Sequence, residues 1–417
     1  MEKGLIVGVN INNQSFETEM IELKELCEAC EIEILDEVTQ NLQEENTKTY
    51  VGKGKIEEIK TAILAKDIDV VICNDELSPA QISALQEILD VLVFDRTYII
   101  LEIFKRRAKT REATLQVDIA SLRYMMPRLS GLRSGFSRQR GAGGAAHGKG
   151  KGETQLEIDR RNIGDRISLL KRELNELITN RQVQRQSRKE NNMKTVCLIG
   201  YTNSGKSTTL NALLQKSTDV KKEVMEKDML FATLETATRK IKLENNRTFL
   251  ITDTVGFVNK LPHQLVEAFK STLEEIKEAD LLLHVVDSSN EQYLTQIETT
   301  NNVIKELGVK DIPIIYVFNK IDKVKDYFYI PPTFDKAIRI SAKTFEGIDD
   351  LTSLIQKELY KDCLNKTFVI PYTKGSIMND LKENAEVINV EYNDFIIVNA
   401  NVNEILYNRY KQYETKK

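Results

Sequence analysis

The chain has 417 residues, a formal net charge of −4, and 41% hydrophobic and 29% charged residues. A chain of this length is too long for one ordinary hydrophobic core and suggests about three domains, or four if some are small. The composition is that of a globular protein. No apolar run approaches the roughly 20 residues of a membrane span and no secretory leader is readable, so no membrane segment and a cytoplasmic location are expected. The five scattered cysteines argue against a disulfide framework.

The N-terminal part, residues 1–95, alternates short apolar runs with helical stretches from Leu5 to Asp95. This order predicts a βαβαβαβ domain with a small parallel sheet. Within it, "YVGKGK" (Tyr50 to Lys55) places two glycines before a predicted helix. The favoured interpretation is a helix-entry turn, and a second phosphate site near Gly52 is the weaker alternative.

Residues 96–192 show helical periodicity on both sides of a glycine-rich interruption. Apolar residues step by three and four along both arms, which is coiled-coil spacing. They are Leu115, Ile119, Leu122 and Met126 on the first arm, and Ile163, Ile167, Leu170, Leu174 and Leu177 on the second. Between them lies "SGLRSGFSRQRGAGGAAHGKGKGE", which is too long for a simple reversal. We therefore predict a helical hairpin with a large tip.

This hairpin region is strongly basic. From Lys105 to Arg166 there are fifteen Lys and Arg residues against six Asp and Glu. Such an excess suits a phosphate-lined RNA surface, and the alternative is a solvated linker. The residues predicted to meet RNA are Arg123, Arg128, Arg133, Arg138, Arg140, Lys149 and Lys151.

Residues 193–362 return to apolar strands followed by helices, which predicts a second, larger α/β domain. Residues 363–417 predict a small βαββα domain, and nothing in its residues indicates a role. The fold class expected is thus α/β, with a P-loop domain between a helical hairpin and a small α+β domain.

The segment "GYTNSGKST" carries the first chemical motif. It fits the pattern GxxxxGK[ST], follows a predicted strand and precedes a predicted helix. Backbone N–H groups of such a loop surround phosphates, while Lys206 reaches the β and γ phosphates and the Ser207 hydroxyl binds Mg²⁺. The predicted nucleotide-binding residues of the loop are Gly200, Tyr201, Thr202, Asn203, Ser204, Gly205, Lys206, Ser207 and Thr208.

A second motif, "DTVG", ends another apolar strand and comprises Asp253, Thr254, Val255 and Gly256. Asp253 is predicted to hold Mg²⁺ and the Gly256 N–H to meet the γ-phosphate. The next residue, Phe257, stands where a polar side chain usually orients the attacking water. The sequence therefore leaves open where that function resides.

Two further motifs select the base. "NKID" contains Asn319, Lys320 and Asp322, and "SAK" contains Ser341, Ala342 and Lys343. Asp322 can accept hydrogen bonds from guanine N1 and N2, and the Ala342 N–H can donate to guanine O6. Adenine would leave the carboxylate without donors, at about 1.5 to 3 kcal/mol for each bond, so GTP is predicted rather than ATP.

A switch segment with a Mg²⁺-binding threonine must precede Asp253. "LFATLETATRK" offers Thr233, Thr236 and Thr238, and composition does not choose among them.

The motif order, "FATL", "SRQ…GETQLEIDRR" and "YVGKGKIEEI" together resemble the HflX family of translational GTPases over roughly the first 360 residues. The resemblance implies that the switch threonine is Thr233, within a nucleotide-binding stretch of Phe231, Ala232, Thr233, Leu234 and Glu235. The family usually continues with Asp-Pro, where this chain has Glu235 and Thr236. The tip also departs from the family's usual "GGIGTRGPGETQLE".

The resemblance implies a cytoplasmic GTP hydrolase that binds the large (50S) ribosomal subunit and its 23S rRNA, and no DNA. It would split stalled ribosomes, with the hairpin tip near the peptidyl-transferase region, and an altered tip could displace antibiotics there. The alternatives are a ribosome-assembly GTPase and a GTP-regulated RNA-binding module with vestigial hydrolysis. The catalytic residues expected are Lys206, Thr233, Gly256 and Asn203. The group that compensates for Phe257 is left open among a K⁺ ion at Asn203, water held by the backbone and the ribosome itself, with His263 the weaker candidate.

Overall fold

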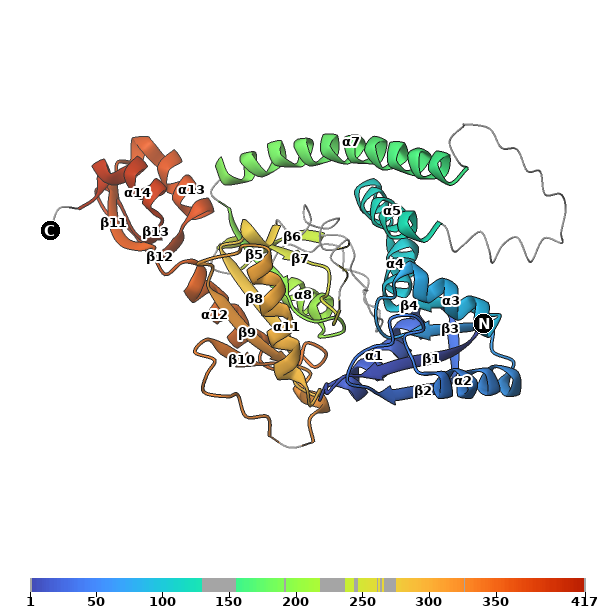
Figure 1. Ribbon diagram of the computed structural model, residues 1–417. Coiled ribbons are helices and arrows are strands. Elements are labelled where there is room, and N and C mark those ends of the chain that lie inside the picture. Colours follow the sequence, from blue (N-terminus) through green and yellow to red (C-terminus); the bar gives the residue numbers. More distant parts are fainter. Residues whose placement is uncertain are drawn as a thin grey trace. The chain divides into compact units, whose positions relative to one another are not determined.

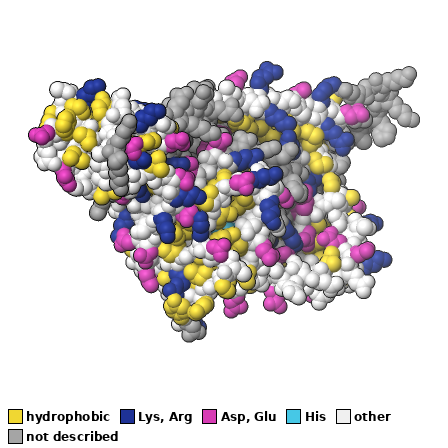
Figure 2. Space-filling view, turned by 90° about the vertical axis from the view of Figure 1, so that its left-hand side faces the viewer, with side chains coloured by type: hydrophobic (Ala, Val, Ile, Leu, Met, Phe, Trp, Pro, Cys, Tyr) yellow, Lys and Arg dark blue, Asp and Glu magenta, His cyan; other side chains and the backbone are white. Residues whose placement is uncertain are grey.

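The computed structural model describes residues 2–129, 155–190, 193–217, 237–243, 247–260, 262, 265, 275–325 and 327–415. Several predicted site residues lie outside these ranges, namely Arg133, Arg138, Arg140, Lys149, Lys151, Phe231, Ala232, Thr233, Leu234, Glu235 and His263. Within the described ranges, no helix is both long and apolar enough to cross a membrane. On the face shown in Figure 2, acidic and basic side chains are interspersed with apolar ones.

The chain divides into two compact units. The first comprises residues 1–184, 229–235 and 258–271, and the second comprises 185–228, 236–257 and 272–417. The second unit thus contains both the phosphate loop and the C-terminal elements. The four domain boundaries predicted from the sequence remain predictions.

The first unit begins with a four-stranded parallel sheet (Figure 1), as predicted. Its strands are β1 (Glu2–Asn10), β2 (Ile32–Asn41), β3 (Val70–Cys73) and β4 (Leu92–Asp95), in the order β2-β1-β3-β4. The connecting helices are α1 (Phe16–Ala29), α2 (Lys53–Lys66) and α3 (Pro79–Leu89). β3 is wholly apolar and buried, and β1 is buried from Gly4 to Val9, whereas the edge strand β2 is partly exposed, so the helices cover the centre of the sheet.

Gly52 lies at the entry of α2, where it is the N-cap residue with extended backbone. Its N–H donates to the Gln40 side-chain oxygen at 2.9 Å. The group that a second phosphate would need is therefore engaged within the protein, which favours the helix-entry interpretation.

The predicted helical pairing is confirmed. The elements are α4 (Arg96–Arg107), α5 (Arg111–Met125), the 3₁₀ turn η1 (Met126–Arg128) and α7 (Gln155–Glu190). The apolar residues that sequence spacing placed on one face of each arm, from Leu115 to Met126 and from Ile163 to Leu177, form one hydrophobic cluster. Outside this seam, α7 is largely polar, so packing against α5 determines which face it buries.

The second unit contains a six-stranded sheet in the order β10-β9-β8-β5-β7-β6. The strands are β5 (Lys194–Ile199), β6 (Ala237–Lys242), β7 (Thr248–Asp253), β8 (Leu281–Asp287), β9 (Ile314–Asn319) and β10 (Ala337–Arg339). All neighbours are parallel except the edge pair β6 and β7. The helices are α8 (Lys206–Gln215), α11 (Tyr293–Glu306) and α12 (Ile348–Leu359).

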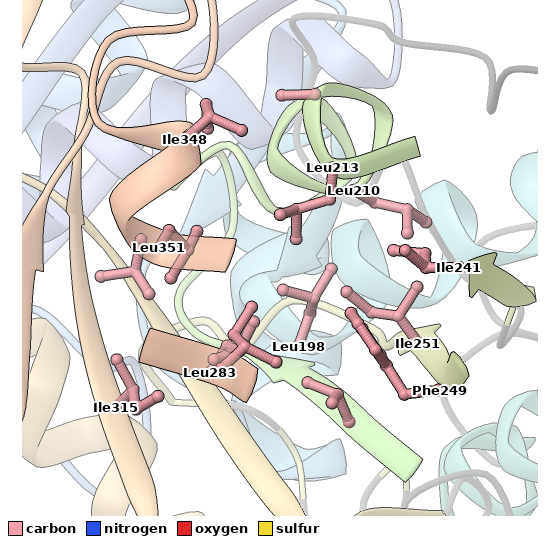
Figure 3. Close-up of a cluster of buried hydrophobic side chains, with 14 of the residues drawn as sticks. Leu198, Leu210, Leu213, Ile241, Phe249, Ile251, Leu283, Ile315, Ile348 and Leu351 are labelled. Atoms are coloured by element: carbon pink, nitrogen blue, oxygen red, sulfur yellow. The ribbon is translucent and has the colours of Figure 1, made fainter. Parts of the chain in front are cut away.

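Apolar side chains of the central strands, α8 and α12 make one core (Figure 3). Leu198, Leu283 and Phe249 come from the sheet, while Leu210 and Leu351 come from the two helices. This core fixes the strand ends from which the polar motifs emerge, as in other open α/β sheets.

The C-terminal elements confirm the predicted βαββα order. They are β11 (Leu364–Ile370), η3 (Tyr372–Lys374), α13 (Gly375–Asn384), β12 (Glu386–Tyr392), β13 (Ile396–Val402), α14 (Glu404–Tyr410) and η4 (Lys411–Tyr413). The antiparallel sheet has the order β11-β13-β12, and its apolar face packs on the helices.

Candidate nucleotide site

The loop between β5 and α8 has the backbone that phosphate binding requires. Gly200 and Gly205 have φ angles of +144° and +92°. A Cβ on Gly200 would lie 2.2 Å from the Val285 carbonyl oxygen, and one on Gly205 would lie 2.2 Å from the Asn319 Nδ2 atom. Only glycine fits at both positions, so the loop stays close to its neighbours, as the backbone of a phosphate-binding loop does.

Lys206 begins α8 and is 6% exposed. Its Nζ atom donates to the Gly200 and Tyr201 carbonyl oxygens at 3.1 and 2.7 Å. Burial lowers the pKa of Lys206 to about 8, although the Asp253 carboxylate raises it in part. The ammonium is thus held within the loop by weak neutral acceptors, and a polyphosphate would be a stronger partner.

The two Mg²⁺ ligands predicted on described residues lie together. The Ser207 hydroxyl donates to the Asp253 Oδ2 atom at 2.7 Å, and Asp253 is fully buried. A hydroxyl beside a carboxylate at the mouth of a phosphate loop is the oxygen set that Mg²⁺ uses in nucleotide sites. These residues therefore fit the ion, which on binding would offset phosphate charge.

The "DTVG" segment packs directly against the phosphate loop. The Phe257 N–H donates to the Gly200 carbonyl at 3.2 Å, and the Thr202 N–H donates to the Phe257 carbonyl at 2.7 Å. A Cβ on Gly256 would lie 2.9 Å from the Lys206 Nζ atom and from the Thr202 backbone. Phe257 is 1% exposed. Its side chain is therefore a packing group, and both of its backbone polar groups are already used.

Asn319 connects the phosphate and base motifs. Its Nδ2 atom donates to the Ser204 carbonyl at 3.0 Å, and its Oδ1 atom accepts from the Ala342 N–H at 3.0 Å. Since the Ala342 N–H donates to Asn319 here, its bond to guanine O6 remains a prediction.

The other base-motif residues are also fixed by side-chain contacts. Asp322 Oδ1 accepts from the Ser341 hydroxyl at 2.7 Å. The Lys320 ammonium donates to the Asn203 carbonyl at 2.5 Å and to Asp287 Oδ2 at 2.7 Å. These bonds hold Asp322 and Lys320 at the same strand ends as the phosphate loop, which suits a guanine nucleotide lying across them.

Asp287 was missed in the sequence interpretation. It ends β8 in register with Asn319 at the end of β9. A charged residue that closes a buried strand beside a recognised motif was the available signal, because neighbouring parallel strands bring their carboxyl ends together. Thr238, one of the three switch candidates, lies on β6 with its hydroxyl 3.0 Å from that of Thr252.

Arg128 was predicted to contact RNA, but it is buried and bonded within the protein. It is 8% exposed and its guanidinium donates to the Leu77 carbonyl at 2.7 Å and to Asp95 at 3.3 Å. It also stacks on the Tyr124 ring, with 3.6 Å from Cζ to the centroid. A buried cation bound in this way is a structural residue of the first unit. Arg123 is half-buried on α5.

The substitution Asp322→Asn should change the base preference of the site from guanine to xanthine. The amide offers a donor where guanine also donates, whereas xanthine presents an oxygen there. Affinity for GTP should fall more than tenfold while that for xanthosine triphosphate rises. Equilibrium titration of both nucleotides measures this. An unchanged ratio of the two affinities would contradict the assigned base site.

Lys206 should take up a proton when nucleotide binds under mildly alkaline conditions. At pH 8.5, with the Lys206 pKa at about 8, much of the lysine is neutral, and phosphate stabilises the charged form. Binding of GDP at pH 8.5 should therefore take up roughly half a proton or more, and much less at pH 7. Calorimetry in two buffers of different ionisation enthalpy measures the uptake. Lys206→Arg, which keeps its charge, should abolish it; equal uptake at both pH values would contradict the assignment.

Family models match most of the chain. They are described as GTP-binding GTPase N-terminal (residues 17–105), GTP-binding GTPase Middle Region (107–188) and 50S ribosome-binding GTPase (195–320). A solved GTP-binding protein from the archaeon Sulfolobus solfataricus, in complex with GDP, is 23% identical with a TM-score of 0.44, covering 87% of this chain and 99% of its own.

Curated relatives are closer in sequence. The GTPase HflX of Caldanaerobacter subterraneus is 43% identical over 393 residues, which cover 94% of this chain and 89% of that protein. The GTPase HflX of Lacrimispora saccharolytica is 42% identical over 404 residues, which cover 96% and 93%. Together with the assembled phosphate, Mg²⁺ and guanine motifs, this similarity shows that the chain belongs to the HflX family of GTPases and hydrolyses GTP with Mg²⁺.

Proposed function

We propose that this GTPase binds the large ribosomal subunit and uses GTP to separate stalled or idle ribosomes into subunits in the cytoplasm. The observation that carries the proposal is the pairing of α5 with α7 through a single apolar seam. Such a pair forms a stiff arm, and the sequence places a segment with six basic residues and one acidic residue between the two helices. A stiff arm with a basic tip suits insertion into a cleft lined by RNA phosphates.

The proposed RNA contacts are Arg123, Arg133, Arg138, Arg140, Lys149 and Lys151, without Arg128. The partner is the 23S rRNA of the subunit, near the peptidyl-transferase region. The departure of the tip sequence from the family's usual pattern supports a second part of the proposal, that the tip displaces antibiotics bound there. Equal drug sensitivity with and without the gene would contradict that part.

The proposed catalytic group must compensate for Phe257. Lys206, Gly256 and Thr233 would stabilise the transferring phosphoryl group, and none of them has a side-chain amide that could orient the attacking water. Asn203 has a left-handed φ of 59° at the exposed turn of the loop, and its carbonyl already accepts from the cation of Lys320. We assign a K⁺ ion to this turn, coordinated by the Asn203 side chain, where its charge would stabilise the transition state.

Ribosome splitting can be measured directly. Intact ribosomes incubated with the protein and GTP should separate into subunits on a sucrose gradient, while Lys206→Ala should leave them intact. Replacing Arg133, Arg138 and Arg140 by Ala should weaken subunit binding. The slope of log affinity against log salt concentration should become shallower by roughly 0.7 to 0.9 for each phosphate contact that is lost. If only immature large subunits bind, the assembly function is correct and splitting is wrong.

The monovalent cation can be tested separately. Exchanging K⁺ for Na⁺ should lower the hydrolysis rate of the wild type, whereas Asn203→Ala should be slow in both salts. The rate should fall by roughly 10²-fold or more, as for loss of one electrostatic contact in the transition state. Identical rates in the two salts, with and without subunits, would exclude the ion.

A further inference from the structure

A basic groove lies within the second unit, away from the nucleotide motifs. It has a volume of about 850 Å³ and is lined by the edge pair β6 and β7, the end of α12, and the C-terminal helices α13 and α14. The sequence of the C-terminal elements indicates no role for them, and the nucleotide site uses none of the lining residues.

Lysine and arginine dominate the charged lining of this groove. Five basic side chains line it, against two acidic ones. The basic residues are Lys240, Lys242, Arg247, Lys382 and Arg409, and the acidic residues are Glu383 and Glu386. The remaining lining is mixed. Asn384, Asn401 and Asn403 carry amides that hydrogen-bond within the protein, and Met193, Ile405 and Leu406 are apolar. The groove therefore carries an excess of positive charge on a mixed surface.

The charges of Glu386 and Arg247 cancel each other, so the positive excess of the groove lies on its other basic residues. Its carboxylate accepts from Arg247 at 2.5 Å and from Asn401 at 2.6 Å. Arg247 also stacks on Tyr360, with its Cζ atom 4.6 Å from the ring centroid, and the Tyr360 hydroxyl donates to the Thr248 carbonyl. These bonds join β7, α12 and the C-terminal sheet into a fixed wall, so the groove is preformed.

The lysines are directed to the groove by the pleat of β6. Side chains alternate along a strand, and Ile241 is buried in the core beneath the sheet. Lys240 and Lys242 therefore stand on the opposite face, two residues and about 7 Å apart. Lys382 is exposed on α13, and Arg409 is exposed on α14, where it pairs with Asp380. Basic side chains are dark blue in Figure 2, in which the side that carries the C-terminal sheet faces the viewer.

We propose that this groove binds a second stretch of ribosomal RNA backbone, with Lys240, Lys242 and Lys382 on the phosphates. Three lysines on two elements, of which Lys240 and Lys242 lie about 7 Å apart, match neighbouring backbone phosphates better than a single small anion. The inference rests on the proposed function for its source of RNA. It gives the C-terminal elements a role, since the complex would then be held at two separate points.

The test compares two double variants of the full chain that remove the same charge. Lys240→Gln with Lys382→Gln removes two groove lysines. The control variant, Lys310→Gln with Lys411→Gln, removes two exposed lysines that do not line the groove. As in the groove variant, one lysine precedes the C-terminal elements and the other lies within them. Binding is measured against salt concentration on large subunits with a GTP analogue, and on a labelled RNA duplex. Thermal melting and basal hydrolysis should match the wild type in both variants.

The groove variant should lose affinity for both probes, and the slope of log affinity against log salt should shrink by roughly 1.5. The control variant should retain the wild-type slope. Equal behaviour of the two variants on both probes would overturn the proposal. Loss of binding to subunits alone, with duplex binding intact, would also overturn it, because the groove would then contact an acidic protein surface. Wild-type protein that binds the duplex but no subunits would contradict the proposed function, and the duplex data would still decide the groove.

Discussion

One buried amide, that of Asn319, holds the nucleotide site together. It is 2% exposed, donates to the phosphate loop at Ser204 and accepts from the guanine loop at Ala342. Gly205 must be glycine because a Cβ would collide with this amide. Phosphate recognition and base recognition therefore share a support, and neither loop can shift without disturbing the other. A buried amide left unpaired costs about 1–3 kcal/mol, so the arrangement is also a stability constraint.

The backbone and side chain of Phe257 are also fixed by contacts with the phosphate loop and the core. Two backbone hydrogen bonds join it to Gly200 and Thr202, and its side chain is buried. A glutamine there would need to leave the core to reach a water molecule. The apolar residue therefore fixes the phosphate loop against "DTVG", while transition-state stabilisation has to come from another source. The segment that follows is held in the first unit, where Lys260 pairs with Asp75 and Glu19 at 2.5 and 2.7 Å.

Much of this could be predicted because the signals are local. Alternating apolar runs and helices gave the N-terminal sheet, and spacing of three and four gave the seam from Leu115 to Leu177. The phosphate and base motifs each require particular residue types within a few positions. Arg128 could not be placed in this way, because its partners Leu77 and Asp95 lie 51 and 33 residues away. Nor could the pairing of Lys260 with Asp75, 185 residues distant, or the groove that β6 forms with α13 and α14.

If the proposed function is correct, the large ribosomal subunit acts on this nucleotide site. The most direct measurement is single-turnover GTP hydrolysis, with the protein in excess, in the presence and absence of purified large subunits. Subunits should accelerate the chemical step by about tenfold or more, which is about 1.4 kcal/mol of transition-state stabilisation. Lys206→Ala should show no acceleration. Equal rates of the wild type with and without subunits would contradict action of the subunit on this site, and would favour a GTP-regulated RNA-binding protein.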